Sequence, residues 1–186
     1  MSNHGGQLIV PAAMQAEIIA HARAGWPEEV CGILRGRDGI VSGLLPATNV
    51  AADRRFNYTV DPTILLRQFD FEEAGEEMIA IYHSHPSSPA YPSATDARQA
   101  TYPDAVYLIC SLQQAQAPVL RGFRLHTLPY DGAASDFPLH PVRGSDDFWA
   151  CQHPEPDAFY LLRLNLPETG FRWLQVRIAE VTLRSS

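Results

Sequence analysis

Two histidines and one aspartate are the residues whose types and spacing predict chemistry in this chain. One residue separates His83 from His85, and Asp96 follows eleven positions after His85. Two imidazoles and one carboxylate form the three-ligand set of a catalytic zinc site, which leaves a fourth position for water. Iron held by two histidines and a carboxylate is the chemical competitor, whereas calcium and magnesium prefer oxygen ligands. We therefore expect a metal centre, and hydrolysis there would also need a carboxylate elsewhere in the chain as a base.

An apolar strand is expected to deliver the two histidines. Residues 78–82 form a short apolar run typical of a buried strand, and side chains on a strand alternate between its two faces. His83 and His85 should therefore leave the same face, close enough to share one ion. Pro86 should end the strand because it cannot donate to the next hydrogen bond of the ladder.

A helix is expected to begin beside the aspartate. Ser93-Ala94-Thr95-Asp96 has the form of an N-cap residue followed by an acidic residue at the third helical position. An isolated pattern of this kind is usually a capping box and nothing more. Its place shortly after the histidine pair favours Asp96 as the third metal ligand.

Two acidic residues are candidates for the missing base. Glu28 and Glu29 directly precede an apolar strand that begins near Val30. On a strand, Glu29 would share a face with Cys31, whereas Glu28 would point the other way. Without the predicted metal site, these two acids would be interpreted as part of a solvent-exposed turn. The metal site makes one of them a candidate base.

The remaining elements predict an α+β fold with a mixed sheet. Asp38-Gly39 is a hairpin signal, and helices and strands are interspersed along the chain. Residues 129–158 are rich in Pro, Asp, Gly, His and Ser, which is typical of a linker or an irregular loop. The expected helices span 12–24, 62–75 and 94–101, and the expected strands span 7–10, 30–36, 40–45, 56–60, 78–82, 105–112, 118–125, 159–164 and 171–183.

Composition narrows the class of protein. A chain of 186 residues has room for one domain with a small extension. Its formal charge of −7 argues against general nucleic-acid binding, which normally needs a basic patch. It contains neither an apolar run long enough to span a membrane nor a signal peptide, so we expect a cytoplasmic protein. The three cysteines include no Cys-x-x-Cys pair, and Cys31 and Cys110 are expected to be small core residues rather than nucleophiles.

The collected residues resemble the motif of the JAMM (MPN-plus) zinc metalloproteases, in their compact prokaryotic form. That motif is a glutamate, a gap, His-x-His-Pro, six residues, a serine, two residues and an aspartate. Here it reads Glu29, then His83-Ser84-His85-Pro86, six residues, Ser93 and Asp96. The segment Glu29-Val30-Cys31-Gly32 is similar to the family's Glu-x-Cys-Gly, which selects Glu29 over Glu28. The resemblance covers about residues 7–128.

This resemblance implies a mixed sheet flanked by helices, with a cytidine-deaminase-like architecture, and one Zn²⁺ per chain. His83, His85 and Asp96 would hold the zinc, with water as the fourth ligand. Glu29 would be the general base that activates this water and then protonates the leaving amine. Ser93 would donate a hydrogen bond to the oxyanion, although its role as a helix cap is an alternative explanation.

The resemblance also implies a substrate class and a division of the chain. JAMM enzymes cleave peptide or isopeptide bonds after the tail of ubiquitin-like proteins, and a compact prokaryotic member is expected to act on a Gly-Gly-ended ubiquitin-like or sulfur-carrier protein. We expect a metalloprotease domain at 1–128, a linker or loop at 129–158 and a C-terminal β-hairpin extension at 159–186. The alternatives are a non-catalytic zinc-binding interaction module and a RadC-like or phage-tail JAMM domain.

Overall fold

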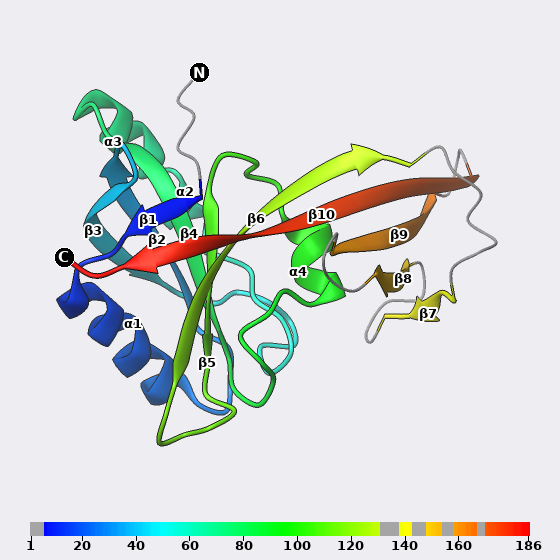
Figure 1. The fold of residues 1–186 in the computed structure, drawn as a ribbon, viewed down its shortest axis with the longest axis horizontal. Coiled ribbons are helices and arrows are strands. Elements are labelled where there is room, and N and C mark those ends of the chain that lie inside the picture. Colours follow the sequence, from blue (N-terminus) through cyan, green and yellow to red (C-terminus); the bar gives the residue numbers. More distant parts are fainter. Residues whose placement is uncertain (1–5, 131–137, 143–147, 154–157, 167–169) are drawn as a thin grey trace. The chain divides into compact units, whose positions relative to one another are not determined.

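A computed structural model describes residues 6–130, 138–142, 148–153, 158–166 and 170–186. The chain forms two compact units (Figure 1). The first contains the chain up to Tyr91, Asp104–Phe123 and Glu180–Ser186, and the second contains Pro92–Pro103 and Arg124–Ala179. Within the described residues, every helix is too short or too polar to cross a membrane.

The first unit is built on a mixed sheet with strand order β1-β3-β2-β4-β5-β6. The pairs β1–β3 and β4–β5 are parallel, whereas β2 pairs antiparallel with both β3 and β4, as does β5 with β6. This arrangement confirms the predicted α+β class. The elements are β1 (Gln7–Ile9), α1 (Ala12–Gly25), β2 (Cys31–Arg37), β3 (Ile40–Ala47), α2 (Pro62–Leu65), α3 (Gln68–Glu73), β4 (Glu77–His85), β5 (Val106–Ser111) and parts of β6 (Val119–Pro129) and β10 (Gly170–Arg184).

The core of this unit lies between α1 and one face of the sheet. α1 contacts β3, β4 and β5, and its Ile18 and Ala22 are fully buried. From the sheet, Leu34, Tyr82 and Leu108 belong to the same apolar cluster. Tyr82 directly precedes His83, so strand alternation turns His83 to the opposite face. The core therefore holds the strand from one side and leaves the other side for the histidines.

The hairpin between β2 and β3 has the turn that its sequence predicts. Asp38 and Gly39 have φ angles of 54° and 78°, in the left-handed region. A two-residue type I′ turn requires this conformation at both central positions, and Asp-Gly is among its preferred sequences. The turn sets the pairing that brings Arg37 opposite Ile40.

Two predictions between β3 and β4 were wrong. Residues 56–60 do not form a strand, and only an isolated bridge joins Asn49 to Val60. The Asn49 side chain bonds the backbone of this segment, accepting from Thr59 N and donating to Asn57 O, both at 3.0 Å. The predicted helix at 62–75 is instead two short helices, α2 and α3, between which Arg67 N bonds Ile64 O in the tighter i→i−3 pattern.

The second unit is a small sheet covered by one helix. Its strand order is β6-β10-β9-β8-β7, and α4 (Ala94–Gln99) packs on β8 and β9. Arg98 of α4 lies over the Phe148 ring at 5.0 Å, and the Tyr160 hydroxyl donates to Pro92 O at 2.9 Å. The remaining strands are β7 (His140–Pro141), β8 (Phe148–His153) and β9 (Phe159–Leu166).

The C-terminal region contains more strand than its composition indicated. β7 and β8 lie within the range 129–158 that we expected to be linker or loop, while 131–137, 143–147 and 154–157 lie outside the described residues. β9 and β10 pair antiparallel from Phe159–Arg177 to Leu166–Gly170. Residues 167–169, between these two strands of the predicted C-terminal hairpin, lie outside the described residues.

The last residues of β10 are part of the first unit. β10 pairs in parallel with β1, with Thr182 opposite Gln7, and Val10 N donates to Arg184 O at 2.8 Å. Val181 is 3% exposed and belongs to the core. Burying an aliphatic side chain of this size contributes about 1.5–3 kcal/mol. The end of the chain therefore helps to stabilise the unit that carries the histidines.

Candidate metal centre

His83 and His85 are held rigidly at the end of β4. Both are buried, at 0% and 3% exposure, and their Nε2 atoms are 3.1 Å apart. The Tyr58 ring stacks on the His83 ring, with centroids 4.2 Å apart and an angle of 16° between the planes. These contacts fix two ring nitrogens so that they face a common point.

A backbone carbonyl selects the tautomer of His85. Its Nδ1 lies 2.8 Å from Pro89 O, and a carbonyl oxygen can only accept. The proton of neutral His85 is therefore on Nδ1, which leaves the lone pair on Nε2. A hydrogen bond from the distal ring nitrogen to a carbonyl is the usual support of a metal-bound histidine.

Asp96 completes a group of three possible ligands. Within the described residues, the ligand atoms of His83, His85 and Asp96 lie within 4.8 Å of one another, and all three side chains are buried. Two neutral imidazoles and a carboxylate match the donor set that zinc prefers. The sequence motif thus corresponds to a spatial cluster whose chemistry fits a divalent metal.

The carboxylate of Asp96 is oriented by the start of α4. Asp96 Oδ2 accepts from Ser93 N at 2.6 Å, and Ser93 Oγ accepts from Asp96 N at 3.1 Å. The two contacts form the predicted capping box. One carboxylate oxygen is thereby tied to the backbone, which fixes the direction of the other.

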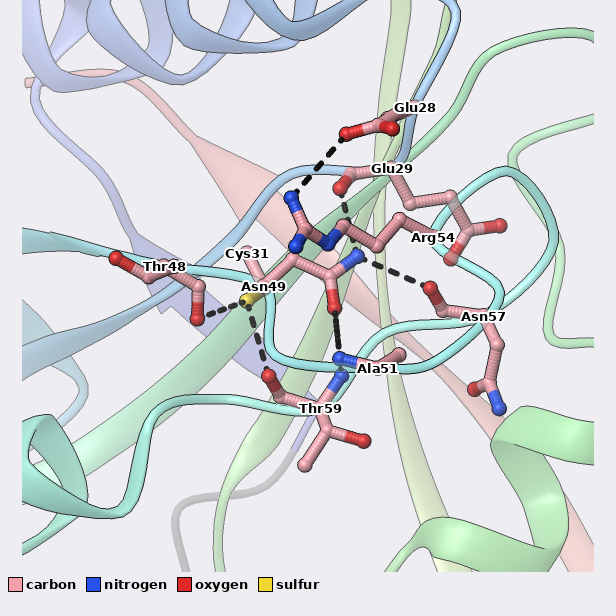
Figure 2. A network of polar contacts seen from close by, with 9 residues as sticks. All are labelled: Glu28, Glu29, Cys31, Thr48, Asn49, Ala51, Arg54, Asn57 and Thr59. Carbon is pink, nitrogen blue, oxygen red and sulfur yellow. Dashed lines mark hydrogen bonds and ion pairs between the residues drawn. The ribbon is translucent and has the colours of Figure 1, made fainter.

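The two candidate acids differ in their surroundings. Glu29 is 8% exposed, whereas the Glu28 side chain is half exposed and lies 3.7 Å from Arg54. Figure 2 shows the Glu29 carboxylate directed away from this Glu28–Arg54 pair. Burial favours Glu29 over Glu28 as the functional acid, because burying a charged group costs free energy.

The backbone of Glu29 is fastened on two sides. Its N–H donates to Arg54 O at 2.6 Å. Its carbonyl accepts from Asn49 Nδ2 at 2.8 Å, as Figure 2 shows. At the next residue, Val30 N donates to Ser84 Oγ at 2.9 Å, and Ser84 is the residue between the two histidines. Glu29 is thus held relative to the strand that carries His83 and His85.

Several of these supporting residues were missed by sequence reasoning. Asn49 lies between the strands predicted at 40–45 and 56–60, Tyr58 lies within the second of them, and Ser84 is only the variable residue of His-x-His. The contacts that tie them to the site, with Glu29, His83 and Val30 respectively, join residues 20 or more positions apart, so no local sequence pattern predicts them. The Asn49 side chain hydrogen-bonds four backbone groups, and this role can be recognised only from the fold.

The cysteines of the first unit are core residues, as predicted. Cys31 and Cys110 are both fully buried. Burial, and secondarily the charge of Glu29, raise the pKa of Cys31 to about 12, and burial raises the pKa of Cys110 to about 11. Both thiols therefore stay protonated near neutral pH, which makes them poor nucleophiles.

Gly32 provides space for the residue before His83. A Cβ at this position would lie 2.4 Å from the Tyr82 ring and 2.5 Å from Leu45 O. The Tyr82 hydroxyl is also fixed, 2.7 Å from His21 Nδ1. The glycine of the Glu-x-Cys-Gly segment is thus required by close packing beside the histidine strand.

Substituting Gly32 with alanine should destabilise the protein. Because the clash involves a backbone oxygen and an anchored ring, we expect the free energy of unfolding to fall by about 1–3 kcal/mol, the range for overpacking, measured by urea denaturation. Gly43→Ala is the control, since its Cβ would meet the flexible side chain of Arg35. Equal losses in the two variants would contradict the packing argument.

Comparisons with known proteins agree with this geometry. Residues 11–126 match the family of prokaryotic homologues of the JAB domain. The chain is 41% identical to the desampylase of Haloferax volcanii over 112 residues, which are 56% of this chain and 81% of that protein. It is 36% identical to the CysO-cysteine peptidase of Mycobacterium tuberculosis over 138 residues, or 73% of this chain and 91% of the relative.

A solved structure is similar as well. A protein of Desulfitobacterium hafniense, known from its solution structure, superposes with a TM-score of 0.57 at 36% sequence identity. The match covers 63% of this chain and 84% of that one. The matched family span, 11–126, includes Glu29 and the three residues of the ligand group, whereas the end of β10 lies beyond it.

Proposed function

Because the chain belongs to the family of prokaryotic homologues of the JAB domain, we propose that it is a zinc peptidase that cleaves after the Gly-Gly tail of a ubiquitin-like or sulfur-carrier protein. The observation that carries the proposal is the convergence of His83, His85 and Asp96 within 4.8 Å. The identities with a desampylase and a CysO-cysteine peptidase support an amide bond to such a protein as the substrate.

His83, His85 and Asp96 would hold the metal. When bound, zinc would supply a Lewis acid that polarises the scissile carbonyl and lowers the pKa of a coordinated water to about 7. The His85 tautomer and the oriented Asp96 carboxylate suit this role, since both present lone pairs to one point. Iron remains the chemical competitor for the same donors.

Glu29 would move the proton during the reaction. As a carboxylate it would accept a proton from the attacking water, which then forms the bond to the carbonyl carbon. It would later give this proton to the leaving nitrogen as the carbon–nitrogen bond breaks. The hydrogen bonds of its backbone with Asn49 and Arg54 support a fixed position of Glu29 for this transfer.

Ser93 would stabilise the oxyanion of the tetrahedral intermediate. Its Oγ already accepts from Asp96 N through a lone pair, and its O–H can donate in another direction. One such donor typically contributes about 3 kcal/mol to the stability of a transition state.

Zinc content and cleavage, measured on one preparation, test the proposal. We expect the protein purified under metal-replete conditions to hold zinc in equimolar amount and to cleave some member of a panel of Gly-Gly-ended ubiquitin-like fusions and lysine conjugates. A chelator should stop cleavage, and added zinc should restore it.

A matched pair of histidine variants controls for unspecific metal binding. His85→Ala should lose zinc, whereas His126→Ala, which changes an exposed histidine outside the ligand group, should keep it. A wild-type protein without zinc would contradict the metal role. Stoichiometric zinc without cleavage of any fusion or conjugate would contradict the substrate class.

A further inference from the structure

The loop that follows His85 is held through three successive backbone carbonyls. Ser88 O accepts from Ser111 Oγ at 2.6 Å, and Pro89 O lies 2.8 Å from His85 Nδ1. Ala90 O accepts from Arg121 Nη1 at 3.3 Å. Each carbonyl thus meets a side chain from a different strand, β5, β4 and β6 respectively.

Strand register explains why these side chains reach the loop. Across the sheet, His83 is opposite Ile109, and Ile109 is opposite Arg121. Two residues further along β4, and therefore on the same face, His85 is opposite Ser111. Residues that pair directly across strands project from the same face. Arg121 and Ser111 therefore belong to the same face of the sheet as the two histidines.

The guanidinium of Arg121 is itself oriented by the end of the chain. Its Nε and Nη2 donate to the two carboxylate oxygens of Glu180 at 2.8 and 2.7 Å, a bidentate pair. The hydrogen bonds from Arg121 hold the pKa of the Glu180 carboxyl below its usual value. Both side chains are partly exposed, so the pair adds little to global stability. Its main effect is to direct the remaining nitrogen, Nη1, toward Ala90.

Aromatic contacts add to this arrangement. Arg121 lies over the Phe123 ring at 5.0 Å and the Tyr91 ring at 5.8 Å, and the two rings meet edge to face. The Tyr91 N–H donates to Pro89 O at 2.8 Å, the same oxygen that His85 contacts. A continuous set of contacts therefore runs from Glu180 through Arg121 and Tyr91 to the oxygen that orients His85.

We propose that Arg121 is a positioning residue of the candidate metal centre, and that Glu180 of the C-terminal strand orients it. Arg121 fixes residues 86–91 so that Pro89 O holds the His85 ring in its metal-binding tautomer and direction. The inference rests on the proposed function for the role of the metal. It gives the end of β10, which lies outside the matched family span, a part in the site.

The test uses the full chain with Arg121→Ala, Arg121→Lys and Glu180→Gln. Three quantities are measured: zinc affinity by chelator competition, hydrogen exchange of residues 86–91 without metal, and kcat and KM at saturating zinc. The control is Glu76→Gln, which weakens the comparable pair of Glu76 with Arg35, at 2.9 Å, elsewhere in the same unit.

Arg121→Ala should bind zinc about ten-fold more weakly, the lower end of the effect of removing a contact behind a metal ligand. The Tyr91 amide should exchange faster, and kcat should fall while KM changes less than about two-fold, because the substrate contacts remain. Glu180→Gln and Arg121→Lys should change the same quantities by smaller amounts, and Glu76→Gln should match the wild type.

Wild-type values of zinc affinity and exchange in Arg121→Ala would overturn the inference. If that variant did not fold, the same result for both Arg121→Lys and Glu180→Gln would overturn it. A wild-type protein that bound no zinc would instead defeat the proposed function. The metal-free exchange of residues 86–91 would still decide whether Arg121 holds the loop.

Discussion

Replacing Glu29 with glutamine should lower the turnover of a Gly-Gly-ended fusion by about 10²–10⁴-fold, the usual contribution of a general base. Glutamine keeps the shape of the side chain but cannot accept a proton from water. The contacts that hold residue 29 use its backbone N–H and carbonyl, with Arg54 and Asn49, and the substitution leaves them in place. Zinc content should not change, since His83, His85 and Asp96 are untouched.

The neighbouring acid provides the control for this experiment. Glu28→Gln removes one charge at the adjacent residue, where the side chain is half exposed and faces Arg54. Its turnover should remain within about two-fold of the wild type, because an exposed ion pair contributes little. If Glu29→Gln kept more than about a tenth of wild-type turnover with full zinc, the proton would have to move through another group.

Local patterns predicted the elements that carry the site. The period of two in a strand places His83 and His85 on one face, and the capping box at Ser93 and Asp96 is determined by four consecutive residues. The turn at Asp38-Gly39 is equally local. In each case the sequence neighbours alone decide the conformation, so the prediction did not depend on the rest of the fold.

Predictions failed where residues outside the segment itself decide the conformation. Residues 56–60 have the composition of a strand, but Asn49 satisfies the backbone there with its side chain instead of a ladder. The contact between Arg121 and Glu180 joins residues 59 positions apart, and the pairing of β10 with β1 joins the two ends of the chain. Such contacts follow from sheet topology, which periodicity does not encode.

A substitution series at Ser93 should separate an oxyanion contact from a helix cap. Ser93→Thr keeps both the hydroxyl and the capping oxygen, whereas Ser93→Gly loses the hydroxyl but remains an acceptable N-cap residue. Replacing a serine cap with glycine costs only a few tenths of a kcal/mol, against about 1 kcal/mol for alanine. Asp96 Oδ2 keeps its hydrogen bond in every variant, because its donor is the backbone N–H of residue 93.

If Ser93 contacts the oxyanion, turnover should follow the hydroxyl. Ser93→Gly and Ser93→Ala should both lose about 10²–10³-fold in kcat, while Ser93→Thr stays close to the wild type. The free energy of unfolding should follow a different order, with glycine near serine and alanine below both. If Ser93 were only a cap, turnover would follow stability instead, and Ser93→Gly would be almost fully active. Urea denaturation and kcat at saturating zinc, measured on the three variants, therefore distinguish the two roles.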